Sequence, residues 1–211
     1  MRALTPFDQK VMAQYGPNVA GVDEVGYSAL AGPLCACALV LRRPDVTDTL
    51  PDGQVIDDSK GLRFEEREAL LPWIRRSSWS AVAWVTNQDI DRLKNIQEAA
   101  KLAMRRAVTK LLRTHPISAV IVDHYAVDLP IPALAEDKAD ARSFIVASAS
   151  IVAKVYRDRF MKTQHHRWPV YGFDTNVGYR GRGQHLDALR KHGPCPLHRR
   201  HMIDRNRHKL S

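Results

Sequence analysis

The fold is decided by residues 19–41, which read VAGVDEVGYSALAGPLCACALVL. Residues 19–25 are an apolar approach that leads into Asp23 and Glu24, and they predict a first strand. Residues 34–41 form a nearly continuous apolar run, which is typical of a central strand buried on both faces. The sequence therefore predicts a sheet whose first strand carries a pair of acids near its end.

Strands and helices alternate along the rest of the chain. The expected strands cover residues 19–25, 34–41, 79–85, 119–122 and, more weakly, 134–138. The expected helices cover residues 64–75, part of 90–113, 142–162 and 184–191. Residues 43–53 predict a loop, and the basic residues 199–209 suit either a helix or a tail. This order predicts an α/β domain with a mixed sheet.

The expected helix at residues 142–162 carries unusually small side chains. Apolar residues recur at helical spacing between Ile145 and Phe160. Residues 147–150 read ASAS. Because these side chains are short, we expect the backbone of this helix to pack closely on the sheet.

The chain is strongly basic. Its 211 residues carry a formal net charge of +9, and the sequence pI is about 9.7. A polyanionic partner such as nucleic acid is one interpretation, because binding to phosphates releases counterions. The alternative is a solvated basic surface that only keeps the protein soluble. The charge alone does not separate these two interpretations.

Neither a membrane segment nor a disulfide framework is expected. No run approaches the roughly 20 apolar residues of a membrane span, and residues 1–14 lack the apolar core of a signal peptide. We therefore expect a cytoplasmic protein. The cysteines are three in number, so we expect reduced, buried thiols. Cys195, His198 and His201 lie close together in sequence, but no second ligand pair follows at zinc-site spacing, and we expect no zinc there.

Four acids stand at the ends of expected strands or at the start of a helix. Asp23 and Glu24 follow the first apolar run, Asp123 follows residues 119–122, and Asp140 precedes the small-residue helix. If the two strands are neighbours, Asp23 and Asp123 lie side by side, and a divalent cation would neutralise their repulsion. Carboxylate oxygens suit Mg²⁺ or Mn²⁺, and a pair of such ions can cleave a phosphodiester. The alternative is that each acid is an ordinary cap or loop residue, Asp140 in particular a helix N-cap.

At these residues the chain resembles the ribonuclease HII family. The opening motif is GVDEVG at residues 21–26, followed by LAGP at residues 30–33. Further matches in the family's order are DDSKGL (57–62), VD (122–123), KAD (138–140), ASASIVAKV (147–155), RDR (157–159), YGF (171–173), GY (178–179), HL (185–186) and GPCPLHR (193–199). The matches cover roughly residues 19 to 200, and their combination is far more specific than any one of them.

The resemblance implies an RNase H-like fold, with a mixed five-stranded sheet flanked by helices and a helical C-terminal extension. It divides the chain into a catalytic domain, residues 1–165, and a basic, helical substrate-binding region, residues 166–211. It implies a catalytic, metal-binding set of Asp23, Glu24, Asp123 and Asp140 with two Mg²⁺ or Mn²⁺ ions. It further implies cleavage on the 5′ side of a ribonucleotide, in RNA–DNA hybrids or in DNA with embedded ribonucleotides, and it makes Asp158 a structural acid paired with Arg157 or Arg159.

The chain departs from the family pattern in several places. The family usually continues its opening motif with Arg-Gly-Pro, whereas this chain has Tyr27-Ser28-Ala29. Tyrosine cannot replace the charged donor fork of arginine, and serine obstructs a close approach that glycine allows. His124-Tyr125 stands where members commonly have Gly-Asn, Val177 where lysine is frequent, and residues 180–183 form a slightly longer segment than usual. We hypothesise that metal chemistry is retained while recognition of the RNA–DNA junction is altered.

The expected substrate contacts rest on the resemblance and on charge. The candidates are Gly26, Tyr27, Ser28, Lys60, Lys154, Tyr179, Arg180 and Arg182. Tyr179 matches the tyrosine that family members stack near the junction sugar, with core packing as the alternative. The lysines would contact phosphate or serve as ordinary surface and pairing residues. The arginines would supply displaced phosphate contacts or be solvated loop residues.

The resemblance predicts a monomeric endoribonuclease. Two rival functions stay open at this point. One is a nuclease of the same fold that acts on DNA strands or branched DNA. The other is a nucleic-acid-binding module that kept the fold but lost turnover. The intact acids argue against the second, and a magnesium-dependent cleavage assay on a substrate panel separates all three.

Overall fold

A computed structural model describes residues 4–43, 61–180 and 184–205. Its centre is a five-stranded sheet in the order β3-β2-β1-β4-β5. The strands are β1 (Val19–Val25), β2 (Leu34–Leu41), β3 (Ser78–Val85), β4 (Ala119–Asp123) and β5 (Ala133–Glu136). Strand β2 is antiparallel to both β1 and β3, whereas β4 pairs in parallel with β1, and β5 pairs in parallel with β4. The sheet is therefore mixed, as predicted.

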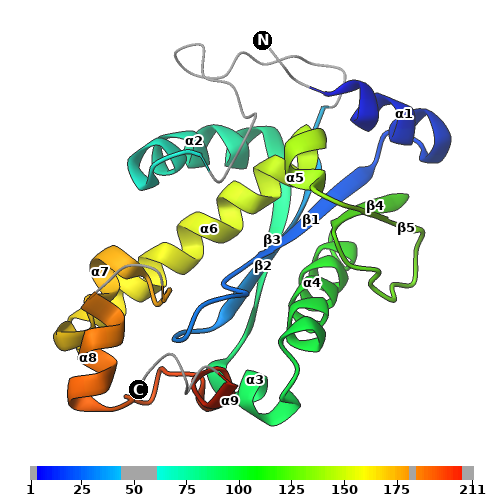
Figure 1. The fold of residues 1–211 in the computed structure, drawn as a ribbon. Coiled ribbons are helices and arrows are strands. Elements are labelled where there is room, and N and C mark those ends of the chain that lie inside the picture. Colours follow the sequence, from blue (N-terminus) through cyan, green and yellow to red (C-terminus); the bar gives the residue numbers. More distant parts are fainter. Residues whose placement is uncertain (1–3, 44–60, 181–183, 206–211) are drawn as a thin grey trace.

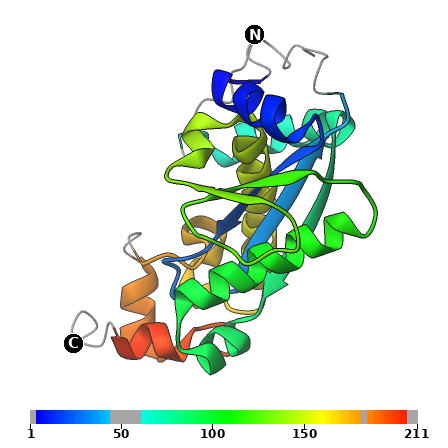
Figure 2. The same cartoon turned by 90° about the vertical axis from the view of Figure 1, so that its right-hand side faces the viewer.

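Helices cover both faces of the sheet. They are α1 (Pro6–Tyr15), α2 (Phe64–Ser77), α3 (Asn87–Leu93), α4 (Ile96–Leu112), α5 (Ala139–Arg142), α6 (Phe144–His165), the 3-10 turn η2 (Pro169–Tyr171), α7 (Phe173–Asn176), α8 (Gln184–His192) and α9 (Arg200–Arg205). Helix α4 packs on one face, and α6 with α2 packs on the other (Figures 1 and 2). Helix α1 and the helices α7–α9 lie at opposite ends of the molecule. The predicted RNase H-like class of fold, a five-stranded mixed sheet flanked by helices, is confirmed.

Alternation along β1 assigns its side chains to two different layers. Ala20 and Val22 pack in the core cluster under α4, whereas Val19 and Val25 pack with residues of α6. Successive side chains of a strand point to opposite faces. Asp23 therefore shares the α6 face, and Glu24 shares the α4 face.

The close packing expected of the small-residue helix is confirmed. A Cβ atom added at Gly21 of β1 would lie 2.7 Å from the backbone nitrogen of Val146 in α6, which is closer than real Cβ contacts come. Ala147, Ser148 and Ala149 of this helix are buried. Strand β1 and helix α6 thus meet backbone to backbone, and this contact sets the distance between the acids of β1 and the side chains of α6.

The start of α6 shows that one alternative for Asp140 is wrong. Ser143, not Asp140, caps this helix, because its hydroxyl accepts a hydrogen bond from the backbone amide of Val146. Asp140 lies in the separate short helix α5. The buried carboxylate of Asp8, in a helix that we did not predict, accepts hydrogen bonds from the Ser143 hydroxyl and the Phe144 amide. Helix α1 therefore anchors the turn that carries Asp140.

The remaining element boundaries differ only locally. The helix expected within residues 90–113 is split, because Lys94 adopts a left-handed conformation and Asn95 caps a new helix through the amides of Gln97 and Glu98. The weak strand expected at residues 134–138 is β5. Within residues 199–209, the described part is helical over α9, and most of the 43–53 loop lies outside the described residues. No helix in the described ranges is both long and apolar enough to cross a bilayer.

Candidate metal centre and active site

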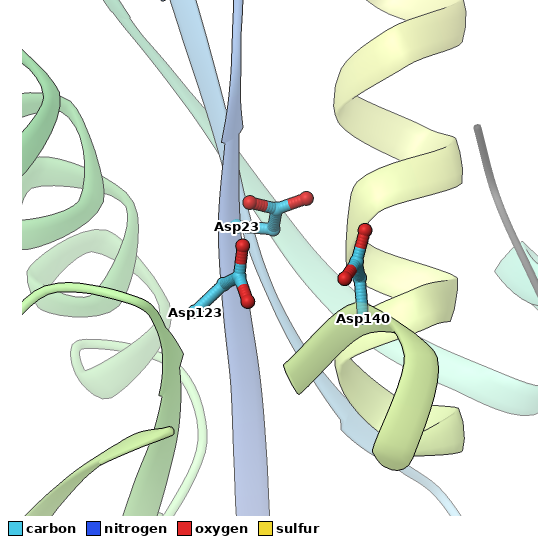
Figure 3. Close-up of side chains that lie close together, drawn as sticks. All are labelled: Asp23, Asp123 and Asp140. Carbon is cyan, nitrogen blue, oxygen red and sulfur yellow. The ribbon is translucent and has the colours of Figure 1, made fainter. Parts of the chain in front are cut away.

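Three of the four predicted acids meet in space. Ligand oxygens of Asp23, Asp123 and Asp140 all lie within 4.8 Å of one another. Figure 3 shows the three carboxylates pointing toward one another from β1, β4 and α5. Within residues 4–43, 61–180 and 184–205, this is the only such group of three or more His, Cys, Asp or Glu side chains.

Strand pairing explains why Asp23 and Asp123 are neighbours. Strands β1 and β4 are parallel, and Val22 pairs with Val122, so the next residue on each strand is the acid. Both acids follow valines that pack under α4, so alternation along each strand turns the two acid side chains toward the α6 face. Asp140 joins them from α5, where the amide of Ala139 donates a hydrogen bond of 2.6 Å to Asp123 Oδ1.

Burial and the neighbouring acids oppose the ionisation of Asp23. Asp23 is 4% exposed. Burial and the neighbouring Asp123, helped by Asp140, raise the pKa of Asp23 from 3.8 to about 7, although a hydrogen bond from Ser150 acts in the opposite direction. Converging carboxylate oxygens are the donor set that hard divalent cations bind, and such a cation would offset the repulsion between the acids. The residues present therefore fit a divalent metal ion.

Glu24 lies beside this cluster rather than in it. It is half-buried and follows Asp23 on the opposite face of β1. Its carboxylate is not part of the three-acid group. It nevertheless lines the same cleft as Asp23 and Asp123, and it lies close enough to Tyr125 to act on the pKa of that phenol. Glu24 thus faces the cleft from the α4 side of the sheet.

A cleft of about 980 Å³ gathers most of the predicted substrate residues next to the acids. It is lined by Asp23, Asp123 and, among the substrate candidates, by Gly26, Tyr27, Ser28, Lys154 and Tyr179. Arg180 is half-buried at the end of a described range and does not line this cleft. Lys60 and Arg182 lie outside the described residues. Segments far apart in sequence therefore build one open site around the carboxylates.

Comparison with known proteins identifies the family. The family model for ribonuclease HII matches residues 20–208. The chain belongs to the ribonuclease HII family. The ribonuclease HII of Syntrophotalea carbinolica is 42% identical over 92% of this chain and 88% of that protein. The ribonuclease HII of Lactobacillus delbrueckii subsp. bulgaricus is 44% identical over 87% of this chain and 68% of that protein. The crystal structure of ribonuclease H2 from Pyrococcus horikoshii is 26% identical, covers 91% of this chain and 98% of that chain, and has a TM-score of 0.69.

The ribonuclease HII motif on α6 contains a paired lysine. Lys154 Nζ donates a 2.7 Å hydrogen bond to Asp158, which also lies 3.8 Å from Arg67. The prediction that Asp158 pairs with Arg157 or Arg159 is wrong, because Arg157 binds backbone carbonyls and Arg159 binds Glu68. Lys154 Nζ also lies 5.2 Å from the ring centroid of Tyr179. A phosphate that contacts Lys154 would thus meet a lysine already held in position.

A second residue of the ribonuclease HII motifs organises the segment after β1. Arg199 is fully buried. Its Nε donates a 2.7 Å hydrogen bond to the carbonyl of Gly32, and its Nη1 donates to the carbonyls of Gly26 at 2.7 Å, Ala29 at 3.0 Å and Tyr27 at 3.3 Å. The guanidinium therefore fixes the backbone that carries Tyr27 into the cleft. Sequence reasoning quoted Arg199 as a motif residue but missed this role.

Arg157 acts in the same way from α6. It is fully buried and donates hydrogen bonds of 2.9–3.0 Å to the carbonyls of Pro33, Ala31 and Val177. Its guanidinium carbon lies 5.0 Å from the ring centroid of Tyr179. Arg157 thus ties the segment after β1 to the turn that positions this tyrosine.

Cys195 and His198 are accounted for by protein contacts. His198 Nδ1 accepts a hydrogen bond from the Cys195 amide at 3.0 Å and lies 3.2 Å from its sulfur, and its Nε2 lies 3.0 Å from Nε2 of His185. The three cysteines are buried and form no disulfide, as expected. Cys195 and His198 belong to a small core with Tyr171 and Phe173.

The raised pKa of Asp23 leads to a prediction about pH. In the folded state Asp23 keeps its proton up to pH about 7, whereas the unfolded chain loses it near pH 3.8. Protonated Asp23 therefore makes its full contribution to the stability of the folded state below about pH 4, and this contribution is lost as the pH rises to about 7. In the presence of a chelator, we expect the melting temperature of Asp23→Asn to exceed that of the wild type by a margin that grows from pH 4 to 7.

Comparing Asp23→Asn with the wild type isolates the contribution of Asp23 to the pH dependence of stability. Burial lowers the pKa of His185, and it lowers that of His198 to about 4. These histidines make stability fall as the pH drops below 6.5, which opposes the effect of Asp23, but they are common to both proteins. Saturating Mg²⁺ should remove most of the margin at pH 7. A difference in melting temperature that does not change with pH would contradict the raised pKa of Asp23.

Proposed function

We propose that this chain is an endoribonuclease that hydrolyses the RNA strand of RNA–DNA hybrids with the help of divalent metal ions. The observation that carries the proposal is the group of three convergent carboxylates in a cleft of a ribonuclease HII family member. The basic charge of the chain supports a nucleic-acid substrate. We also propose DNA with embedded ribonucleotides as a second substrate, for which the preference is altered relative to the family pattern.

We assign the chemistry to four acids. Asp23, Asp123 and Asp140 would hold a divalent ion, and Glu24 would complete the set from the α4 side of the cleft. Mg²⁺ or Mn²⁺ in this site supplies an activated water and stabilises the departing oxygen. The hydroxyl of Ser150 holds the Asp23 carboxylate in place by a hydrogen bond. No serine, cysteine or histidine nucleophile is needed.

We assign substrate binding to the walls of the cleft and to the C-terminal part. Lys154 and Tyr179 would contact the phosphate and sugar next to the cleavage site. We further propose a division into a catalytic part, residues 1–165, and a basic substrate-binding part, residues 166–211. Helix α6 ends at His165, and the elements after it pack around a small core that includes Phe173 and is shared with Ala31 and Met161.

A substrate panel tests the proposed function. Uniform RNA–DNA hybrid, duplex DNA and branched DNA are incubated with the protein and with Mg²⁺, Mn²⁺ or a chelator. We expect metal-dependent cleavage of the RNA strand of the hybrid, with 3′-hydroxyl and 5′-phosphate ends. Preferential cleavage of DNA would favour the related nuclease, and binding without cleavage would favour the non-catalytic module.

The altered segment after β1 predicts a substrate preference. Tyr27 and the exposed Ser28 line the cleft where the family pattern has arginine and glycine. Without the charged fork and the close approach, we expect a duplex with one ribonucleotide to be cut less efficiently than a uniform hybrid. The measurement is kcat/KM for both substrates at the same concentrations of salt and metal ion. Equal or better cleavage of the single-ribonucleotide duplex would reject the hypothesis. The double change Tyr27→Arg with Ser28→Gly should bring the kcat/KM values of the two substrates closer together.

A further inference from the structure

Two residues that depart from the family pattern lie against each other on the α4 side of the cleft. The rings of Tyr27, after β1, and Tyr125, after β4, stack with their centroids 6.0 Å apart and an angle of 21° between their planes. Burial, followed by the neighbouring Tyr27 hydroxyl, raises the pKa of Tyr125, which is consistent with the close approach of the two side chains. Residues 98 positions apart in sequence thus form one aromatic unit, the Tyr27–Tyr125 pair.

The pair is mounted rigidly. The backbone of Tyr27 is held by Arg199, which donates hydrogen bonds to the carbonyls on both sides of it. Tyr125 follows His124, which has φ +63°, a conformation that costs a non-glycine residue about 1 kcal/mol or more. The His124 ring packs edge-on against Tyr125 at 4.5 Å and lies 2.8 Å from Asp137. A side chain held in a strained backbone by its own contacts is a feature of binding sites more often than of ordinary loops.

The Tyr27–Tyr125 pair lies in the same cleft as the acids of the proposed active site. Tyr27 and Tyr125 line the cleft together with Glu24 and Asp123. Each ring packs on the core under α4 with one part and is only half-buried, so each keeps surface that faces the cleft. Arginines and lysines on α2 and α6 line the same cleft, among them Arg67, Lys154 and Lys162. Within the described part of the cleft, basic groups therefore line the α6 side, next to Tyr179, and the Tyr27–Tyr125 pair lines the α4 side.

We propose that the Tyr27–Tyr125 pair is an aromatic shelf on which a sugar–base unit of the nucleic acid packs beside the carboxylates. The shelf replaces a charged contact by a neutral one. Aromatic rings bind nucleotides through the face of the base or sugar, and every base offers such a face. Each tyrosine also carries a hydroxyl group, which can donate a hydrogen bond to the bound strand. This inference rests on the proposed function for the identity of the substrate.

Binding measured without cleavage tests the shelf. A fluorescent RNA–DNA hybrid is titrated with each variant in a chelator at several salt concentrations. We expect Tyr27→Leu and Tyr125→Leu each to weaken binding about tenfold, which is within the range for loss of one stacking contact. The double variant should lose little more than either single one, because the rings act as a unit. The slope of log Kd against log salt should not change, because no charge is removed.

Matched variants separate the shelf from simple space filling. Tyr27→Phe and Tyr125→Phe keep the rings and should bind within about threefold of the wild type, since an ordinary hydrogen bond contributes little net free energy. Tyr27→Arg should increase the salt slope by about one, which corresponds to one new phosphate contact. Melting temperatures confirm that each variant is folded. Folded leucine variants that bind like the wild type would overturn the shelf.

The outcome is independent of the proposed reaction. Absence of hybrid cleavage by the wild type in Mg²⁺ would refute the proposed function but leave the binding result intact. Conversely, full cleavage with no loss of affinity in the leucine variants would refute the shelf alone.

Discussion

Asp23→Asn is expected to reduce kcat/KM on an RNA–DNA hybrid by at least about a thousandfold, which corresponds to a loss of several kcal/mol of transition-state stabilisation. Asp23 is the most buried member of the three-acid group, and its neighbours already oppose its ionisation. Asparagine keeps the size of the side chain but removes the charge that would hold a divalent ion. Cleavage is measured with both Mg²⁺ and Mn²⁺, so that weakened affinity for one metal is not mistaken for lost chemistry.

The same substitution should stabilise the metal-free fold near neutral pH. Without metal, the three carboxylates repel one another in a buried site, and removing one of them relieves this repulsion. A higher melting temperature together with lost activity identifies a site in which stability is sacrificed for function. Asp128→Asn, at an exposed acid outside the cleft, serves as the control and should change neither quantity. A folded Asp23→Asn protein with near wild-type activity would end the metal assignment.

Arg199→Met is expected to destabilise the fold by about 3–5 kcal/mol, a large fraction of the total stability of a domain. The substitution removes the donors for the four carbonyls of Gly26, Tyr27, Ala29 and Gly32. Methionine fills a similar volume but offers no hydrogen bond, so these carbonyls lose the donors that the guanidinium supplies. Chemical denaturation followed by circular dichroism measures the free energy of unfolding.

Two comparison variants make this result specific. Arg200→Met alters the adjacent, exposed arginine, whose backbone rather than its side chain contacts Asp91, and it should change stability by less than about 0.5 kcal/mol. Arg199→Lys keeps the charge but not the planar fork, and it should fold with reduced stability and weakened hybrid cleavage. If Arg199→Met is as stable as the wild type, the guanidinium does not organise the segment after β1.

Most of the sheet was predictable from the sequence because strand signals are local. Strand β3, expected at residues 79–85, begins at Ser78, and β1 and β2 have the expected bounds. Helix α1 was missed although Thr5 and Asp8 form a capping box there, with Pro6 at the first helical position. Its hydrophobic face is short, and only the contact of Asp8 with the start of α6 shows what it does.

The candidate site was predictable in part for a different reason. The positions of Asp23, Asp123 and Asp140 at strand ends and at the start of a helix singled them out, and the resemblance added their roles. Parallel pairing of β1 and β4 then explains why the first two are neighbours. The placement of Glu24 apart from that group follows from alternation along β1, which the sequence-based reasoning did not apply. The pairing of Asp158 with Lys154 and Arg67 was also missed, since Arg67 lies on a helix distant in sequence.

The sequence by itself determined the class of fold, the acids and the family, because hydrophobic periodicity and short motifs are properties of neighbouring residues. Only the tertiary structure decided which of those residues meet. The contact of Tyr27 with Tyr125 and the bonds from Arg199 to the segment after β1 join positions that are far apart in the chain. Such contacts depend on how the sheet and its two helical layers close around the cleft, and a single sequence carries no local signal for them.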